Sequence, residues 1–218
     1  MDINEILRYM GCPPEQAAPQ TRTLAEQAAV QMEQTARPRS VFREFGLSIT
    51  GDGVLLESGL LLPGRDLAQH LAGCDRAVLL AVTLSAQADA LIRRAESRDM
   101  AQALALDCAA AALVEEVCDR LEADIFAKYP GCYFPFRFSP GYGDLPLSVQ
   151  SGLLTLLDAP RKIGLCANEN HILTPRKSVT ALIGISREPV DRAVRSCQSC
   201  PGREGCQYRK SGGHCGAS

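Results

Sequence analysis

The sequence predicts an α+β fold, a single domain in which several helices pack on a twisted antiparallel sheet. Several long segments carry apolar residues at helical spacing, and short apolar runs of strand length occur between and after them. These strands do not alternate with helices in the regular rhythm of a parallel sheet. With 218 residues, of which 46% are hydrophobic, the chain can bury one core of adequate size. We expect this domain to span residues 1–186 and a short Cys-rich tail to occupy residues 187–218.

The individual elements follow from local patterns. Alternating Phe45, Leu47 and Ile49 lead into the turn signal at residues 50–53, which predicts a β-hairpin over residues 42–61. Segments with helical spacing predict helices over residues 3–10, 20–36, 65–72, 85–95, 98–129 and 149–158. Short apolar runs predict strands over residues 77–83, 163–167, 170–174 and 178–185.

Two helix ends have specific signals. Tyr129-Pro130-Gly131 closes the longest helix, because proline and glycine both stop a helix. Ser148 is of a residue type that caps helices, so we expect it to begin the helix over residues 149–158, which ends before Pro160.

Charge and hydropathy exclude several classes of protein. The net charge of −2 argues against a general nucleic-acid binder. The first eleven residues carry Asp2, Glu5 and Arg8 among their apolar residues, which is unlike the apolar segment of a signal peptide. No apolar run approaches the ~18 residues that a membrane span needs. We therefore expect a cytoplasmic protein without membrane contact.

The segment from Arg137 to Tyr142, Arg-Phe-Ser-Pro-Gly-Tyr, gathers unusual chemistry in six residues. Arg137 supplies a forked donor suited to a carboxylate, and Tyr142 supplies a flat apolar face with a polar tip. Pro140 fixes its own φ, while Gly141 can take a positive φ or let a ligand approach the backbone closely. The segment is either an ordinary Pro-Gly turn or a loop that holds a small ligand.

The ten cysteines form two groups. Without a secretory signal, the scattered ones are predicted to be small buried hydrophobic residues and not disulfide partners: Cys12, Cys74, Cys108, Cys118, Cys132 and Cys166. The others lie in the basic tail with the spacing C-x2-C-x5-C-x8-C: Cys197, Cys200, Cys206 and Cys215. Four thiolates suit an iron-sulfur cluster or zinc, and the irregular spacing favours the cluster. The alternative is an unstructured Gly-rich tail with reactive thiols.

Residues 133–186 resemble the activation domain of cobalamin-dependent methionine synthase. The likeness is carried by the run from Tyr133 to Gln150, by Asn168-Glu169-Asn170 and by the segment from Pro175 to Thr180. That domain has an Arg-x-x-Pro-Gly-Tyr loop that binds S-adenosylmethionine, then a helix, a Thr-Glu-Ser-like segment and a strand containing Ser-Val. The N-terminal part resembles the separately encoded small-subunit form of the domain.

The resemblance implies a function. The domain would present S-adenosylmethionine to a separate corrinoid protein or methionine synthase core, whose oxidised cob(II)alamin is reduced and remethylated during methionine biosynthesis. Arg137 would take the ligand carboxylate, the backbone of Ser139-Pro140-Gly141 would frame the ligand, Tyr142 would pack on it, and Glu169 would support it. Such a cobalamin-dependent methyltransferase subunit needs no general acid or base. No Asp-x-His-x-x-Gly cobalamin signature is present, so cobalamin would come with the partner.

Carboxylates in the longest helix admit two interpretations. Asp107, Glu115 and Asp119 can line one helix edge, and a carboxylate such as Asp107 among alanines and leucines is costly unless it is paired or exposed. The edge either faces solvent, or it contacts the cationic groups of S-adenosylmethionine or orients Arg137.

Two other functions stay open. In one, the tail holds a cluster that passes an electron from a donor to a corrinoid protein, and the Arg-Pro-Gly-Tyr loop is scaffold. In the other, the chain is a zinc-stabilised interaction protein without catalysis. The chain has only three histidines, His70, His171 and His214, and the sequence shows no Ser/His/Asp or Cys/His constellation.

Overall fold

The computed structural model describes residues 1–190, 204, 205 and 210. These residues form two compact units, the first from residues 1–36 and 87–116 and the second from residues 37–86 and 117–190. The division into a domain over residues 1–186 and a tail over residues 187–218 stays a prediction. Among the described residues, no helix has the length and apolar character needed to cross a bilayer.

The first unit is helical. It contains α1 (Ile3–Tyr9), a 3₁₀ turn (Pro14–Gln16), α2 (Pro19–Thr35), nearly all of α4 (Ala86–Glu96) and the beginning of α5 (Met100–Phe126). Asp2 caps α1, since its side chain accepts a hydrogen bond of 2.8 Å from the Asn4 amide. Helices α1 and α2 pack together, and α2 buries mainly alanines, whose small side chains let helix backbones approach.

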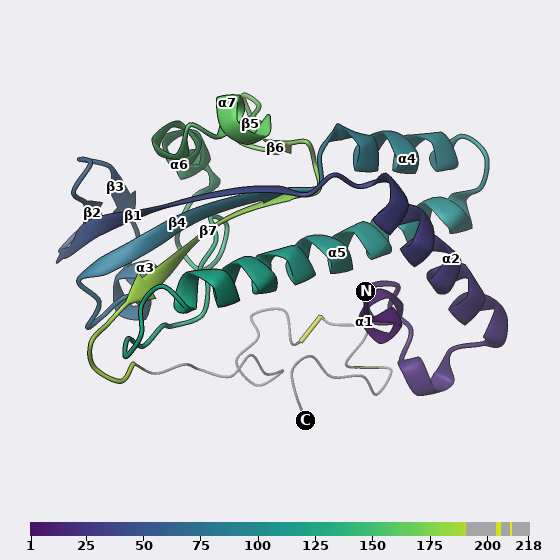
Figure 1. The fold of residues 1–218 in the computed structure, drawn as a ribbon, viewed down its shortest axis with the longest axis horizontal. Coiled ribbons are helices and arrows are strands. Elements are labelled where there is room, and N and C mark those ends of the chain that lie inside the picture. Colours follow the sequence, from purple (N-terminus) through teal and green to yellow (C-terminus); the bar gives the residue numbers. More distant parts are fainter. Residues whose placement is uncertain (191–203, 206–209, 211–218) are drawn as a thin grey trace. The chain divides into compact units, whose positions relative to one another are not determined.

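The second unit is built on a five-stranded antiparallel sheet in the order β3-β2-β1-β4-β7 (Figure 1). The strands are β1 (Arg39–Thr50), β2 (Gly53–Leu56), β3 (Leu61–Pro63), β4 (Arg76–Thr83) and β7 (Ser178–Ile185). Phe45 pairs with Ala77 and Leu79 pairs with Leu182, which fixes the face that each residue presents. The prediction of an α+β fold with a twisted antiparallel sheet is confirmed.

Helices α6 (Gln150–Leu157) and α7 (Ala159–Ile163) cover one face of this sheet by packing on β1 and β4 (Figure 1). The core beneath them draws on every strand of the sheet, and its members include Phe45, Val54, Leu62, Leu79, Leu153, Leu157 and Leu182. Nearly all of β4 is buried, which explains why its sequence is continuously apolar and does not alternate.

The segment after α5 runs along the outer edge of β7. Tyr133 exchanges backbone hydrogen bonds with Ser186, and Phe138 does the same with Leu182, at 2.8–3.0 Å. This pairing satisfies backbone groups that an edge strand would otherwise expose. It also fixes the register of residues 133–138, so the side chain of Arg137 is placed by the sheet.

Two sequence predictions around Pro160 are wrong in detail. Ser148 lies in a 3₁₀ turn (Leu147–Val149), and no side chain caps α6. The expected helix does end before Pro160, at Leu157, but a second helix, α7, follows directly with Pro160 in its first turn, where proline is well tolerated. The strands expected over residues 163–167 and 170–174 shrink to β5 (Cys166–Ala167) and β6 (Leu173–Thr174), which form a separate two-stranded hairpin.

Candidate functional site

Arg137 lies where the segment along β7 meets the last turns of α5. Its Nη1 donates to Asp119 Oδ1 at 2.7 Å and also to Glu122 Oε1. The Arg137 side chain is 6% exposed and that of Glu122 is 10% exposed, whereas that of Asp119 is 68% exposed. Residues three apart on a helix share one edge, which is why α5 presents both carboxylates to one guanidinium.

This arrangement bears on the acidic edge predicted from the sequence. Asp119 contacts Arg137, as one of the two interpretations expects. Glu122 was missed, although its spacing of three residues from Asp119 was a usable signal. Asp107 and Glu115 are half-buried and belong to the first unit, and their ligand role stays a prediction.

Residues 139–145 form a loop closed by its own backbone. The Tyr142 amide donates to the Ser139 carbonyl at 3.0 Å, and the Gly141 amide donates to the Leu145 carbonyl at 2.8 Å. Gly141 has a φ of 91°, the positive value that its residue type makes accessible. Tyr142 is 50% exposed and its ring meets that of Phe138 edge to face, with centroids 6.1 Å apart. The loop therefore presents one aromatic ring to solvent on a hydrogen-bonded frame.

Asp144 joins this loop to α3 (Arg65–His70). Its carboxylate accepts hydrogen bonds from the backbone amides of Arg65, at 2.7 Å, and Asp66, at 3.1 Å. The two neighbouring glycines leave room for this contact: a Cβ on Gly64 would stand 3.0 Å from Asp144 Cγ, and one on Gly143 would stand 2.8 Å from Asp66 Cβ. The loop and the start of α3 thus interlock. Sequence reasoning missed Asp144, because the contact joins residues 78 positions apart.

His70, at the end of α3, packs against the same segment. Its ring lies 4.6 Å from that of Phe136 and 5.1 Å from that of Phe138, and its Nε2 lies 2.7 Å from the Phe136 carbonyl oxygen. A carbonyl only accepts, so Nε2 carries the hydrogen. Burial lowers the pKa of His70 from its ordinary value, which favours a neutral ring. The three rings brace the strand segment that carries Arg137.

Glu169 lies apart from these contacts, in the turn between β5 and β6. Asn168 organises this turn, because its Oδ1 accepts from the amides of Asn170, at 3.0 Å, and Ile172, at 2.9 Å. Glu169 is exposed. Its ligand role stays a prediction.

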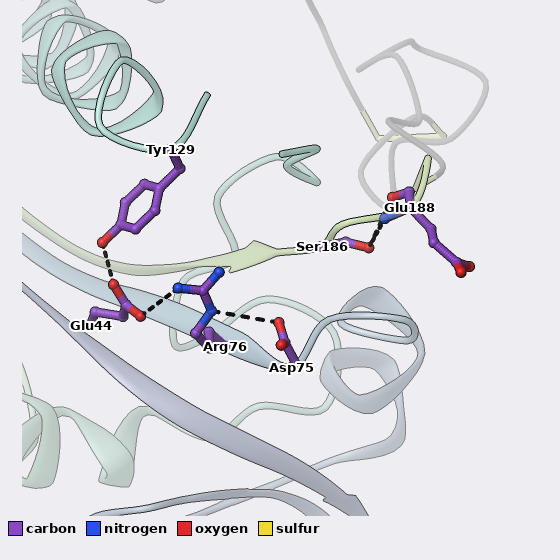
Figure 2. A network of polar contacts seen from close by, with 6 residues as sticks. All are labelled: Glu44, Asp75, Arg76, Tyr129, Ser186 and Glu188. Atoms are coloured by element: carbon purple, nitrogen blue, oxygen red, sulfur yellow. Dashed lines mark hydrogen bonds and ion pairs between the residues drawn. The ribbon is translucent and has the colours of Figure 1, made fainter. Parts of the chain in front are cut away.

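A second polar cluster, also missed from the sequence, lies near the beginning of β4 (Figure 2). Arg76 Nη1 donates to Glu44 Oε1 at 3.0 Å, its Nε lies 3.6 Å from Asp75 Oδ1, and the Tyr129 hydroxyl donates to Glu44 Oε2. Burial and the Glu44 carboxylate raise the pKa of Tyr129 to about 12. Nearby, the Ser186 hydroxyl accepts from the Glu188 amide at 3.1 Å (Figure 2).

The six scattered cysteines, all within the described residues, differ in burial. None of the six scattered cysteines forms a disulfide within the described residues, but the prediction of burial holds only for Cys74, Cys108 and Cys118. Cys12 and Cys132 are half-buried, and Cys166, in the short strand β5, is exposed. Cys197, Cys200, Cys206 and Cys215 lie outside the described residues, within which no group of His, Cys, Asp or Glu could hold a metal.

The chain has the fold of a known domain. The solved structure described as "Crystal Structure of the MetH Reactivation Domain bound to AdoHcy" matches 88% of this chain and 74% of its own chain, with a TM-score of 0.57 and 18% identity. No protein-family model matches the chain, and no curated protein matches it. The likeness to an activation domain expected from residues 133–186 is confirmed at the level of the fold.

Proposed function

We propose that this chain binds S-adenosylmethionine (AdoMet) and supports the reductive remethylation of a separate corrinoid protein. One observation carries the proposal: an Arg-x-x-Pro-Gly-Tyr loop lies on the fold of a reactivation domain that was solved with AdoHcy. AdoHcy is what remains of AdoMet after its methyl group is transferred, so a fold that accommodates one is a candidate for the other.

The residues around the loop suit such a ligand. Arg137 would receive the ligand carboxylate through charge-assisted hydrogen bonds, and the exposed ring of Tyr142 would pack on an apolar part of the ligand. The frame from Ser139 to Gly141 would set the approach of the ligand to the backbone. Interlocking with α3 through Asp144 limits how far this frame moves, which favours a defined ligand geometry.

The chemistry asks little of this chain beyond positioning. The partner's corrinoid supplies the nucleophile when bound, and the sulfonium of AdoMet is a good leaving group that departs as neutral AdoHcy. A reductant of low potential has to supply one electron for each methyl group transferred. Effective orientation of two reactants is worth a large rate factor on its own. The role of the chain is to hold the methyl group toward the partner.

Binding is tested by calorimetry on two tyrosine variants that differ in position alone. Tyr142 and Tyr133 are 50% and 46% exposed and belong to the same segment. Tyr142→Ala should weaken AdoMet binding by roughly three- to tenfold, the worth of one aromatic packing contact. Tyr133→Ala should leave the affinity unchanged. Equal affinities for both variants and the wild-type chain would contradict the assignment of the loop.

Methyl transfer is tested in trans. The chain is mixed with a partner loaded with cob(II)alamin, a low-potential reductant and AdoMet labelled at the methyl group. The label should reach the corrinoid only when the chain is present and should decrease with Tyr142→Ala. Anaerobic purification with assays for iron, sulfide and zinc decides the role of the tail. Full activity of the loop variant combined with inactive tail-cysteine variants would favour the electron-transfer function.

A further inference from the structure

The Nη1 of Arg137 contacts two carboxylates that differ in exposure. Nη1 serves both Asp119 Oδ1, at 2.7 Å, and Glu122 Oε1. One positive charge thus faces two negative charges. A ligand carboxylate that approached this group without any rearrangement would meet a net negative site, and like charges at such distances repel.

We propose that Asp119 is an internal competitor for the ligand carboxylate at Arg137. On binding, the carboxylate of AdoMet replaces Asp119, while Glu122 stays and keeps the guanidinium in place. This inference rests on the proposed function and adds a specificity-determining residue to it. It accounts for an arginine that is both ion-paired in the described structure and suited to receive a ligand.

The difference in exposure decides which carboxylate leaves. The Asp119 side chain is 68% exposed, so its carboxylate regains water when it moves away, and exposed ion pairs contribute little to stability. The Glu122 side chain is 10% exposed, and separating it from Arg137 would leave a buried charge without compensation. Exchange at Asp119 is therefore the lower-energy route.

Competition also confers selectivity. A ligand with a carboxylate gains the contact that displaces Asp119, whereas an analogue without the carboxylate cannot make this exchange. Removing the competitor should help only the first kind of ligand. Because AdoMet carries a net positive charge, a general loss of negative charge would weaken its attraction to the protein, so a gain in affinity has the opposite sign to the nonspecific effect.

Calorimetry on three proteins tests the proposal. Asp119→Asn should bind AdoMet about two- to fivefold more tightly than the wild-type chain, the factor that an exposed ion pair is worth. Asp124→Asn is the matched control, because it removes a carboxylate from an exposed position of the same helix, and it should bind no more tightly than the wild-type chain. Decarboxylated AdoMet should show no gain with Asp119→Asn. Thermal unfolding checks that both variants are folded.

The outcomes separate this inference from the proposed function. If the wild-type chain does not bind AdoMet, both fail. If the wild-type chain binds and Asp119→Asn binds equally or more weakly, the competitor role is overturned while the proposed function stands, and weaker binding would assign Asp119 to a cationic group of the ligand. An equal gain with decarboxylated AdoMet would also overturn it.

Discussion

Arg137 and Arg76 each meet two carboxylates, yet they do so at different depths in the second unit. The Arg137 side chain is 6% exposed and its partner Glu122 is 10% exposed, whereas Arg76 and Glu44 are 29% and 34% exposed. A buried pair is costly to break from one side, while a partly exposed pair is screened by water. We therefore expect the buried Arg137 pair to stay closed beside the loop. The partly exposed pair of Arg76 and Glu44, which joins β4 to β1, should separate more easily.

Removing Arg137 should destabilise the chain much more than removing Arg76. Arg137→Ala should lower the free energy of unfolding by about 3 to 5 kcal/mol, because it leaves Glu122 buried without its counterion. Arg76→Ala should cost only about 1 kcal/mol or less. Urea unfolding of both variants measures this difference. Similar losses for the two arginines would show that burial does not distinguish them.

Arg137→Ala should also weaken AdoMet binding by roughly 1.5 to 3 kcal/mol, the worth of a charge-assisted contact. Calorimetry below the unfolding transition checks this. If the variant does not fold, the double variant Arg137→Lys with Asp119→Asn replaces it in the AdoMet titration. Lysine keeps the positive charge but loses the forked geometry that binds a carboxylate.

The loop beside Arg137 offers a second test of rigidity. Gly143→Ala should cost roughly 2 to 3 kcal/mol, because φ is +51° there and the new Cβ would meet the side chain of Asp66. Gly131→Ala is the control: its φ is +77° and no atom lies within 4 Å of the new Cβ, so it should cost only the backbone term of about 1 kcal/mol. Thermal unfolding measures both. Equal costs would mean that the loop yields easily.

The cluster around Arg76 should respond to alkaline pH. The pKa of Tyr129 is raised to about 12 in the folded chain, above the ordinary value of 10.0. Between these values the unfolded chain loses the proton and the folded chain keeps it, so stability should fall as the pH rises from 10 toward 12. Tyr129→Phe should flatten this decline in urea titrations at several pH values. If stability falls with pH as steeply in the variant as in the wild-type chain, Tyr129 does not cause the decline.

A weaker dependence on pH is expected from His70, which packs against the segment that carries Arg137. Burial lowers the pKa of His70 from its ordinary value of 6.5, so below that pH the unfolded chain takes up a proton that the folded chain resists. Stability should therefore fall modestly as the pH decreases below 6.5. His70→Gln, which keeps a donor for the Phe136 carbonyl, should not show this decrease in stability at acid pH. If the decrease persists in the variant, other titrating groups cause it.

The fold class, most helices and the strand with a continuously apolar run follow from the sequence alone, because periodicity and length report burial directly. It also identified the residues of the Arg-Pro-Gly-Tyr loop, since proline and glycine act locally on the backbone. Tertiary structure alone decided that Pro160 lies in the first turn of a helix and that Ser148 caps none, because both depend on the path of the chain. It also decided that Asp144 locks the loop to α3 and that Glu122 pairs with Arg137. These contacts join residues that are distant in the sequence, 78 positions apart for Asp144 and Asp66 and 15 for Arg137 and Glu122, and only the folded chain brings them together.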